Sequence, residues 1–507
     1  MVGSPSSGRE SSEYDVVVVG AGSAGLCSAI SARRHDARVL VLEKAPPEEQ
    51  GGNCSYAGGG LRFVHNGVAD IAPLLAAKGE DPYPALEPYI AEDYRYDLLK
   101  ASQGQVDPDL MEMVVEKSYA TMRWLTSLGV VWEQRMYQAP VTYAYLPGTV
   151  SVGATGGGEG LLGMLTSAAK AAGVEIAYCA KMLRLCLGPA NRISAVTVAR
   201  EDQVYDISTH AVVLACGGFE ANQEMRIRYL GPVWEGVQVR GSRHNTGDGL
   251  RAVLDLGAAT TGRLTGCHAV PVGASTLPVG TPESAAGVSR RSYNLRSHHL
   301  RSYHLGIMVN VEGKRFTDEG QGIGDLHFRQ AAAVILSQPQ RMAFQIFDTK
   351  ATPHLSTRYA SSKRISAHTI GELAQRLGIP VPALEETVRE FNNACDYPEH
   401  FDPLAPDEHC TRDLTPPKSN WAIPLDSPPF AAYRVTGGIT YTYGGLKVDR
   451  NARVLNTEDV PIGGLYAAGV IVGGFFHHES LRGSGLMLGA VLGRIAGEHA
   501  ATSARVT

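Results

Sequence analysis

Three glycines and one acidic residue near the start of the chain have the types and spacing needed to bind a dinucleotide. Gly20, Gly22 and Gly25 form a G-x-G-x-x-G pattern, and Glu43 lies about 20 residues further on. The first glycine allows a tight turn, the second lets a pyrophosphate approach the backbone, and the third lets a helix pack closely on a strand. Glu43 is then placed to bind a ribose hydroxyl. The alternative is a βαβ turn with a purely structural role.

The elements that must position these residues can be read from the flanking sequence. Val16–Val19 is an unbroken apolar, β-branched run, which predicts a parallel strand buried on both faces. Val39–Leu42 predicts a second strand that ends at Glu43. A helix must begin at the glycines, and its N-terminus supplies amides and a positive dipole end for phosphates.

Composition limits the possible classes of function. A chain of 507 residues is too long for one hydrophobic core, and 44% apolar residues with 57 glycines are typical of a loop-rich α/β enzyme. The net charge of −5 argues against a nucleic-acid partner. Eight cysteines without a C-x-x-C pattern indicate free thiols, no metal site and a reducing, cytoplasmic location. No apolar run reaches the roughly 20 residues of a membrane span.

The order of the predicted elements indicates two domains. Strand–helix alternation continues to about residue 256, fades from 257 to 424, where Arg, His, Ser and Pro accumulate, and then returns. Asp107 and Pro108 predict the start of a helix in the first segment. Within the middle segment, Thr369 and Glu372 predict a helix cap, and Pro382 predicts the start of another helix. We therefore expect an α/β fold: a Rossmann-type domain (14–256 and 425–507), an inserted α+β capping domain (257–424) and a disordered tail (1–13).

Several motifs together resemble one flavoprotein superfamily. AVVLACGGFEAN (211–222), GITYTYGGLKVD (438–449), GLYAAG (464–469) and GSGLMLGAVLGRIAG (483–497) are similar to segments of the fumarate reductase and succinate dehydrogenase flavoproteins. RGSRHNTGDGLRAVLDLGA, TGCHA, SYHLGIMVN and EGKRFTDEG are most similar to FAD-dependent tricarballylate dehydrogenases, and the cofactor segments also resemble 3-ketosteroid Δ1-dehydrogenases. The resemblance implies an FAD domain with an inserted cap and a substrate held between them.

The resemblance also implies which residues hold FAD. They lie in the glycine-rich turns and at strand ends: Gly20, Ala21, Gly22, Ser23, Ala24, Gly25, Glu43, Lys44, Gly52, Asn53, Cys54, Gly58, Gly59, Gly60, Ala215, Cys216, Gly217, Asn222, Asp248, Gly469, Gly485, Leu486 and Met487. The glutamate that the family carries after GLYAAG is Val470 here, so one ribityl hydrogen bond must come from elsewhere. No histidine stands at the covalent attachment position, which indicates noncovalent FAD.

The chemistry of this superfamily exchanges a hydride and a proton across a carbon–carbon bond, so the protein must supply an acid/base and hold an electron-withdrawing group. His268 matches a histidine that binds a substrate carboxylate; the alternative is a core histidine that bonds a backbone carbonyl. Arg482 lies near a carboxylate-binding arginine of the superfamily, and a guanidinium matches a carboxylate in bidentate fashion. The alternative is a surface arginine.

Other candidates carry less specific signals. His477 and His478 precede Arg482 and can act as base or anion clamp, and Tyr441 can hydrogen-bond the substrate, transfer a proton or only pack in the core. Residues 290–304, RRSYNLRSHHLRSYH, can clamp a polyanion through His298, His299 or Arg301, or form a solvated basic loop or subunit contact.

One departure leaves the catalytic base unassigned. Fumarate reductases place a proton-donating arginine shortly after the RF-x-x-E stretch, whereas RFTDEGQGIGD (315–325) has none after Arg315, and His327 and Arg329 are the nearest substitutes. We expect an FAD-dependent dehydrogenase that desaturates a bond beside a carboxylate or carbonyl of a small-molecule substrate, with an external electron acceptor. The alternatives are enoate reduction, desaturation of a steroid-like ketone, and a flavin-binding electron-transfer subunit of a membrane redox complex.

Overall fold

The computed structural model describes residues 13–79, 86–134, 150, 152–274, 299–323, 325–396, 402–403 and 405–505. Up to residue 261 the strands and helices are β1 (Tyr14–Val19), α1 (Ser23–Arg34), β2 (Val39–Leu42), α2 (Val68–Leu75), α3 (Ala91–Ser102), α4 (Pro108–Ser127), β3 (Trp132–Gln134), β4 (Val152–Ala154), α5 (Gly157–Ala171), β5 (Glu175–Ala177), β6 (Ala180–Leu187), β7 (Ile193–Arg200), β8 (Gln203–Leu214), α6 (Gln223–Met225), β9 (Gln238–Val239), α7 (Asp248–Leu254) and β10 (Thr260–Thr261). The remainder are β11 (Cys267–Gly273), β12 (Ile307–Asn310), α10 (Asp325–Leu336), β13 (Ala343–Phe347), β14 (Ile365–Ala367), α11 (Ile370–Leu377), α12 (Val381–Asn393), β15 (Phe430–Thr442), β16 (Gly445–Leu446), β17 (Arg453–Leu455), β18 (Pro461–Ala467) and α13 (Ser484–Ala504).

The first sheet is built around β1. Its strand order is β17-β18-β8-β1-β2-β5, and β6 and β7 extend from β8. The strands next to β1 are parallel to it, and Val16, Val17 and Val18 are completely buried, as the apolar run predicts. The sheet carries β1 and β2 side by side, so the glycine turn and Glu43 emerge at the same edge.

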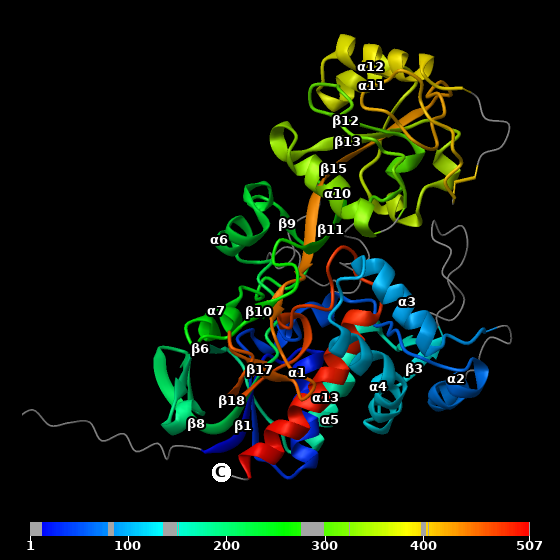
Figure 1. Ribbon diagram of the computed structural model, residues 1–507. Helices are drawn as coiled ribbons and strands as arrows, with labels where there is room; N and C mark the ends of the chain where they lie inside the picture. Colours follow the sequence, from blue (N-terminus) through cyan, green and yellow to red (C-terminus); the bar gives the residue numbers. More distant parts are fainter. Residues whose placement is uncertain are drawn as a thin grey trace, which may run out of the picture.

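Helices α1 and α13 pack closely because glycines recur every four residues along α13. A Cβ at Gly493 would lie 2.6 Å from the Ala24 carbonyl oxygen, and one at Gly497 would lie 2.1 Å from that of Ser28. Figure 1 shows the two helices side by side over the first sheet. The glycines of the second half of GSGLMLGAVLGRIAG therefore serve helix packing. No helix of the described residues is long and apolar enough to cross a membrane.

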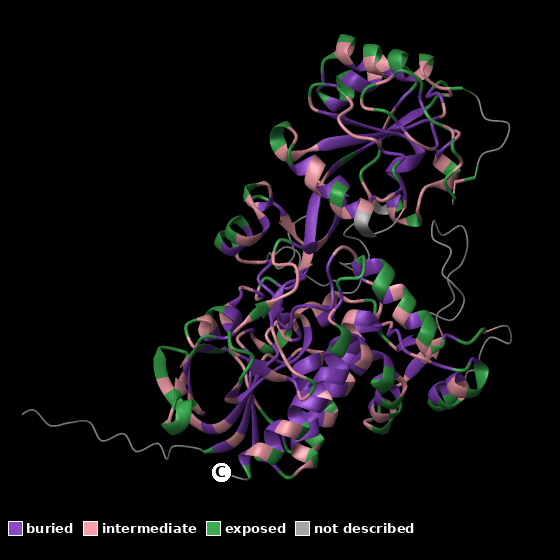
Figure 2. Ribbon diagram, viewed as in Figure 1, coloured by how far each residue is buried: buried purple, intermediate pink, exposed green. Residues whose placement is uncertain are grey.

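The second sheet lies in a separate part of the molecule, the upper or second body, which is drawn at the top of Figure 1. Its order is β11-β15-β13-β12, with β14 and β9 also paired to β15. Alternate residues of β12 enter two cores: Met308 packs with Phe328 of α10 on one face, while Ile307 packs with Leu373 and Phe391 of α11 and α12 on the other. Figure 2 shows the exposed residues of α11 and α12 on their outer side.

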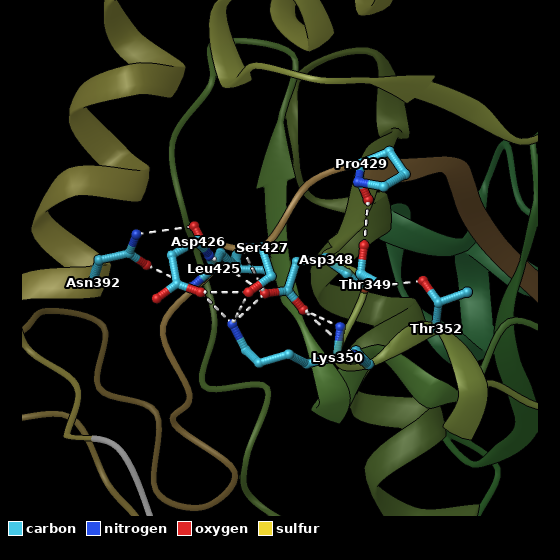
Figure 3. Close-up of polar contacts among 10 residues, drawn as sticks. Asp348, Thr349, Lys350, Thr352, Asn392, Leu425, Asp426, Ser427 and Pro429 are labelled. Carbon is cyan, nitrogen blue, oxygen red and sulfur yellow. Dashed lines mark hydrogen bonds and ion pairs between the residues drawn. The ribbon is translucent and has the colours of Figure 1, made fainter.

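In the second body, polar contacts connect the segment that follows β13 with the segment that precedes β15. Lys350 Nζ lies 2.6 Å from Asp348 Oδ2 and also pairs with Asp426, and it donates to Ser427 Oγ at 3.1 Å (Figure 3). Asn392 of α12 donates to the Leu425 carbonyl at 3.0 Å and accepts from the Leu425 amide at 2.7 Å. These contacts tie the chain that returns from the second body to both β13 and α12.

Strand β15 connects the two bodies. It begins in the upper body of Figure 1 and runs down toward the first sheet. The predicted boundaries place β9 and β15 in the first domain, because the boundary at 256/257 follows β9 and the one at 424/425 precedes β15. Both strands nevertheless pair in the second sheet. The residue limits of the two domains stay a prediction; the sheets themselves form the α/β fold with an inserted α+β body.

The predicted helices occur close to their expected positions. Asp107 caps α4 by accepting from the Leu110 amide at 3.0 Å, and Thr369 caps α11 by accepting from the Glu372 amide at 3.1 Å. In a capping box the Glu372 side chain would accept from the Thr369 amide. Here it accepts from the amide of His368, one residue earlier. Helix α12 begins at Val381 rather than at Pro382.

Candidate active site

One cavity of about 530 Å³ connects the two bodies of the molecule. The β1–α1 turn lines one end, which we call the nucleotide end, with Glu43, Lys44 and Asp248. Side chains from β11, β15 and the segment 299–301 line the other end, which we call the cap end. The cavity therefore spans the distance from the G-x-G-x-x-G motif to the candidates for catalysis.

The nucleotide end begins at the N-terminus of α1. Gly22 is the N-cap, no side chain caps the helix, and the first turn contains no acidic residue. Ser23 and Ala24 line the cavity. A Cβ at Gly25 would lie 1.9 Å from the Gly20 carbonyl oxygen, so the third glycine serves strand–helix packing. The N-terminus of α1 therefore directs uncapped backbone amides and the positive end of the helix dipole into the cavity. This arrangement fits a diphosphate group.

The charged residues at the nucleotide end already have partners in the protein. Glu43 accepts from the amides of Ala21 and Ala45 at 2.9 Å each, which leaves its carboxylate further acceptor capacity for a ribose. Lys44 Nζ lies 2.6 Å from Asp248 Oδ2. Burial alone would raise the pKa of Asp248, but the hydrogen bond and charge of Lys44 lower it to about 2. This end fits the ADP half of FAD.

Most of the residues expected to bind the cofactor line this cavity. They are Gly20, Gly22, Ser23, Ala24, Glu43, Lys44, Gly52, Asn53, Cys54, Gly58, Gly59, Gly60, Ala215, Cys216, Gly217, Asp248, Gly469, Gly485 and Leu486. Val470, which replaces the family's glutamate, also lines it.

Four expected cofactor residues do not reach the cavity. Ala21 and Met487 are completely buried in the protein core, and Gly25 is covered by Gly20. Asn222 instead caps α6, because its Oδ1 accepts from the Met225 amide at 3.1 Å and its Nδ2 donates to the Thr246 carbonyl at 3.0 Å. These four residues belong to the turns that surround the cavity, and they do not form its lining.

A β-bulge shapes the wall at the cap end. His268 of β11 lies opposite Tyr441 of β15, and Ala269 lies opposite Ile439, so Thr440 is the extra residue. The bulge lets Thr440 and Tyr441 both line the cavity. The rings of His268 and Tyr441 stack with centroids 5.2 Å apart, and His268 Nδ1 lies 3.0 Å from Thr440 Oγ1.

Arginines gather beside this wall. Arg240 is 2% exposed, donates to Thr440 Oγ1 at 2.8 Å and contacts Nε2 of His299. Arg301 lies 2.6 Å from His299 Nδ1, and Arg358 also lines the cavity. We call Arg240, Arg301 and Arg358 the arginine cluster. Burial, followed by the charges of Arg301 and Arg358, holds the pKa of Arg240 well below its usual range.

The described residues that line the cap end include no carboxylate: the acidic residues of the lining, Glu43, Glu49 and Asp248, lie on nucleotide-end segments. Burial and the neighbouring arginines lower the pKa of His299 well below its ordinary value, so this imidazole is neutral at pH 7. An anionic ligand is the group that such an arrangement accommodates.

The remaining candidates lie in different surroundings. Arg482 lines the cavity, but its side chain is exposed. His477 and His478 do not line it; His478 Nδ1 lies 2.7 Å from Arg263. His477 is buried and His478 is half-buried. His327 and Arg329 are also outside the lining, and His298 lies outside the described residues.

Reasoning from the sequence missed Arg240, Arg358 and Thr440. Arg240 reaches the site because β9 pairs with β15, a contact between segments about 200 residues apart. The segments RGSRHNTGDG and GITYTYGG were singled out, but nothing in either pattern distinguishes these two side chains from their neighbours. Arg358 lies in a stretch without any motif, and no sequence signal marks it.

Comparison with known proteins identifies the cofactor. Residues 15–486 match the family model described as "FAD binding domain". The chain is 28% identical to a probable fumarate reductase of Shewanella frigidimarina over 96% of this chain and 75% of that protein. It is also 28% identical to a 4-oxocyclohexanecarboxylate 2-dehydrogenase of Sinomonas cyclohexanicum, over 91% and 88% of the two chains. The open conformation of a flavocytochrome c3 fumarate reductase superposes with a TM-score of 0.73 at 26% identity, covering 97% and 79%.

Proposed function

The chain belongs to the FAD binding domain family and is an FAD-dependent oxidoreductase acting on CH–CH groups, and from that premise we propose its substrate class. We propose that it desaturates a carbon–carbon bond beside a carboxylate in a substrate that carries two or more carboxylates, of the tricarballylate kind. Bound FAD supplies the hydride acceptor for this reaction.

The observation that carries this proposal is the arginine cluster. Arg240, Arg301 and Arg358 line one end of the cavity without a carboxylate among the described residues there. Hydrogen bonds between charged groups contribute about 1.5–3 kcal/mol each, and guanidinium groups match carboxylates in bidentate geometry. Three guanidinium groups that line one end of a cavity fit a polyanion better than a neutral, steroid-like ketone.

The side chains divide the work between binding and proton transfer. The arginine cluster holds the carboxylates on the cap side, and Arg482 holds a carboxylate at the more open wall. His268 and Tyr441 line the same cavity, and His268 Nδ1 lies 3.0 Å from Thr440 Oγ1. The Nε2 of His268, when unprotonated, or Tyr441 as a phenolate would receive the substrate proton.

Reduction of an unsaturated carboxylate is the second candidate. Relatives that include a probable fumarate reductase align over 96% of the chain, and the same groups serve either direction of hydride exchange. The binding argument from the arginine cluster applies equally to both directions.

Anaerobic flavin spectroscopy separates these possibilities. Tricarballylate and succinate are expected to bleach the flavin of the purified holoenzyme, whereas butyrate and a steroid ketone leave it oxidised. If dithionite-reduced enzyme is instead reoxidised by fumarate or aconitate without bleaching by the saturated acids, the reductase direction holds. Bleaching by the ketone but by no carboxylate contradicts the proposal, and reduction only through a protein partner supports an electron-transfer subunit.

A further inference from the structure

One buried acid of the cofactor region has no part in the chemistry above. Glu220 lies in the turn CGGFEAN that follows β8, is completely buried and does not line the cavity. A charged side chain in an apolar, glycine-rich turn is costly unless it has partners. Its contacts connect it to the cavity wall.

Two asparagines of the wall donate to the same oxygen of Glu220. Asn53 Nδ2 lies 2.8 Å and Asn245 Nδ2 lies 2.7 Å from Oε1, and both asparagines line the cavity. Because their amino groups face Glu220, their carbonyl oxygens face elsewhere: Asn53 Oδ1 accepts from the Ser242 amide at 2.8 Å. A Cβ at Gly217 would lie 3.0 Å from the Asn245 amide, so Asn245 sits against a glycine of the cofactor turn.

The second carboxyl oxygen has a different environment. Oε2 is buried and accepts no hydrogen bond among the described residues, and the same holds for Thr442 Oγ1. The titratable groups that face the carboxyl are Arg226, which donates to the Glu220 backbone carbonyl at 2.8 Å, and Cys267 of β11. Burial raises the pKa of Glu220 to about 7, although the bonds from Asn245 and Asn53 lower it.

We propose that Glu220 is a positioning residue for FAD: it fixes the orientation of Asn53 and Asn245 at the cavity and takes up a proton when FAD binds. FAD carries two phosphate charges and displaces water from the wall that covers Glu220, and both effects favour the neutral carboxyl. The inference requires only the FAD site and is independent of the substrate.

The direction of the pH dependence of FAD binding follows from the difference in the pKa of Glu220 between the FAD-free protein and the complex. If FAD raises the pKa of Glu220, the affinity for FAD is greatest below the pKa of the FAD-free protein and falls as the pH rises toward the pKa of the complex. Wild-type protein is expected to bind FAD about three- to tenfold more weakly at about pH 8 than at about pH 6.

Reconstitution of FAD-free protein tests the proposal. The dissociation constant is measured by quenching of flavin fluorescence across this pH range for the wild type, Glu220→Gln, Glu220→Ala and Glu224→Gln, an exposed control in the same segment. Gln imitates the neutral carboxyl and accepts from both asparagines, so Glu220→Gln should bind tightly and independently of pH. Glu220→Ala should bind weakly at every pH, and Glu224→Gln should behave like the wild type.

Calorimetry supplies a second readout that does not depend on the variants. FAD binding to the wild type near pH 7, in buffers of different ionisation enthalpy, should show net proton uptake that is absent from Glu220→Gln. A pH-independent affinity with no proton uptake in the wild type overturns the proposal, and so does an unchanged pH dependence in Glu220→Gln. Binding by Glu220→Gln as weak as that of Glu220→Ala also overturns it.

Discussion

The two ends of the cavity handle charge in opposite ways. At the nucleotide end, Glu43 accepts from two backbone amides, and Asp248 pairs with Lys44 at 2.6 Å. At the cap end, Arg240, Arg301 and Arg358 are neighbours, and the described lining there holds no carboxylate. The described lining therefore pairs opposite charges at the first end and collects positive charge at the second.

This difference assigns separate tasks to the two ends. Paired charges and backbone amides bind a cofactor that stays in place, because they require little rearrangement. Neighbouring guanidinium groups repel one another, and an anionic substrate that binds to them lowers that repulsion. We therefore expect changes at the nucleotide end to alter FAD content and changes at the cap end to alter turnover with FAD retained.

The largest expected effect comes from Gly25→Ala. The new Cβ would lie 1.9 Å from the Gly20 carbonyl oxygen, so the turn must shift, and overpacking of this kind costs about 1–3 kcal/mol. The variant should lose nearly all FAD, as measured by the flavin-to-protein absorbance ratio. Gly163→Ala is the control: nothing lies within 4 Å of its Cβ position in α5, and it should keep FAD with slightly higher stability.

Arg240→Gln should affect the cap end almost as strongly but in a different measurement. Loss of two charge-assisted bonds to substrate, at about 1.5–3 kcal/mol each, should reduce kcat/KM for a polycarboxylate by on the order of 10²–10³. FAD content should stay unchanged, because Arg240 lies at the cap end of the cavity. Arg434→Gln, an exposed position on β15, should change none of these, and loss of flavin in Arg240→Gln would contradict the division of tasks.

Arg482→Ala should have a smaller effect than Arg240→Gln. Its side chain lines the cavity but is exposed, so water screens its charge, and we expect kcat/KM to fall by about 10–10². Arg482→Lys should recover part of the loss, since the ammonium keeps the charge without the planar fork. Steady-state kinetics with full FAD occupancy decide the matter; an unchanged kcat/KM removes Arg482 from the substrate site.

Lys181→Ala should have the smallest effect. Lys181 Nζ lies 3.6 Å from Asp248, and its side chain is 47% exposed, so the pair contributes at most about 1 kcal/mol. The dissociation constant for FAD should change by less than about fivefold. Lys44→Ala removes the closer partner of the same carboxylate and should weaken FAD binding more than Lys181→Ala does. Equal losses of FAD affinity in the two variants would show that the burial of the Lys44–Asp248 pair is unimportant.

Local patterns were sufficient where a few neighbouring residues decide the structure. Val16–Val19 predicts the buried strand, Asp107 and Thr369 predict helix starts, and Gly20, Gly22 and Glu43 predict the nucleotide end. The structure places three other predicted side chains outside the cavity lining: Asn222 caps α6, and His477 and His478 do not line it. A side chain's neighbours in sequence do not determine which wall it faces.

The sequence by itself determined the FAD fold and the nucleotide end, because strand, turn, helix and acid follow one another within about 30 residues of a βαβ unit. The tertiary structure alone decided the cap end. Arg240, His299 and Tyr441 meet there because β9 and β11 pair with β15, His299 bridges Val272 of β11, and a bulge displaces Thr440. Such long-range register depends on the packing of whole sheets, and no local pattern contains it.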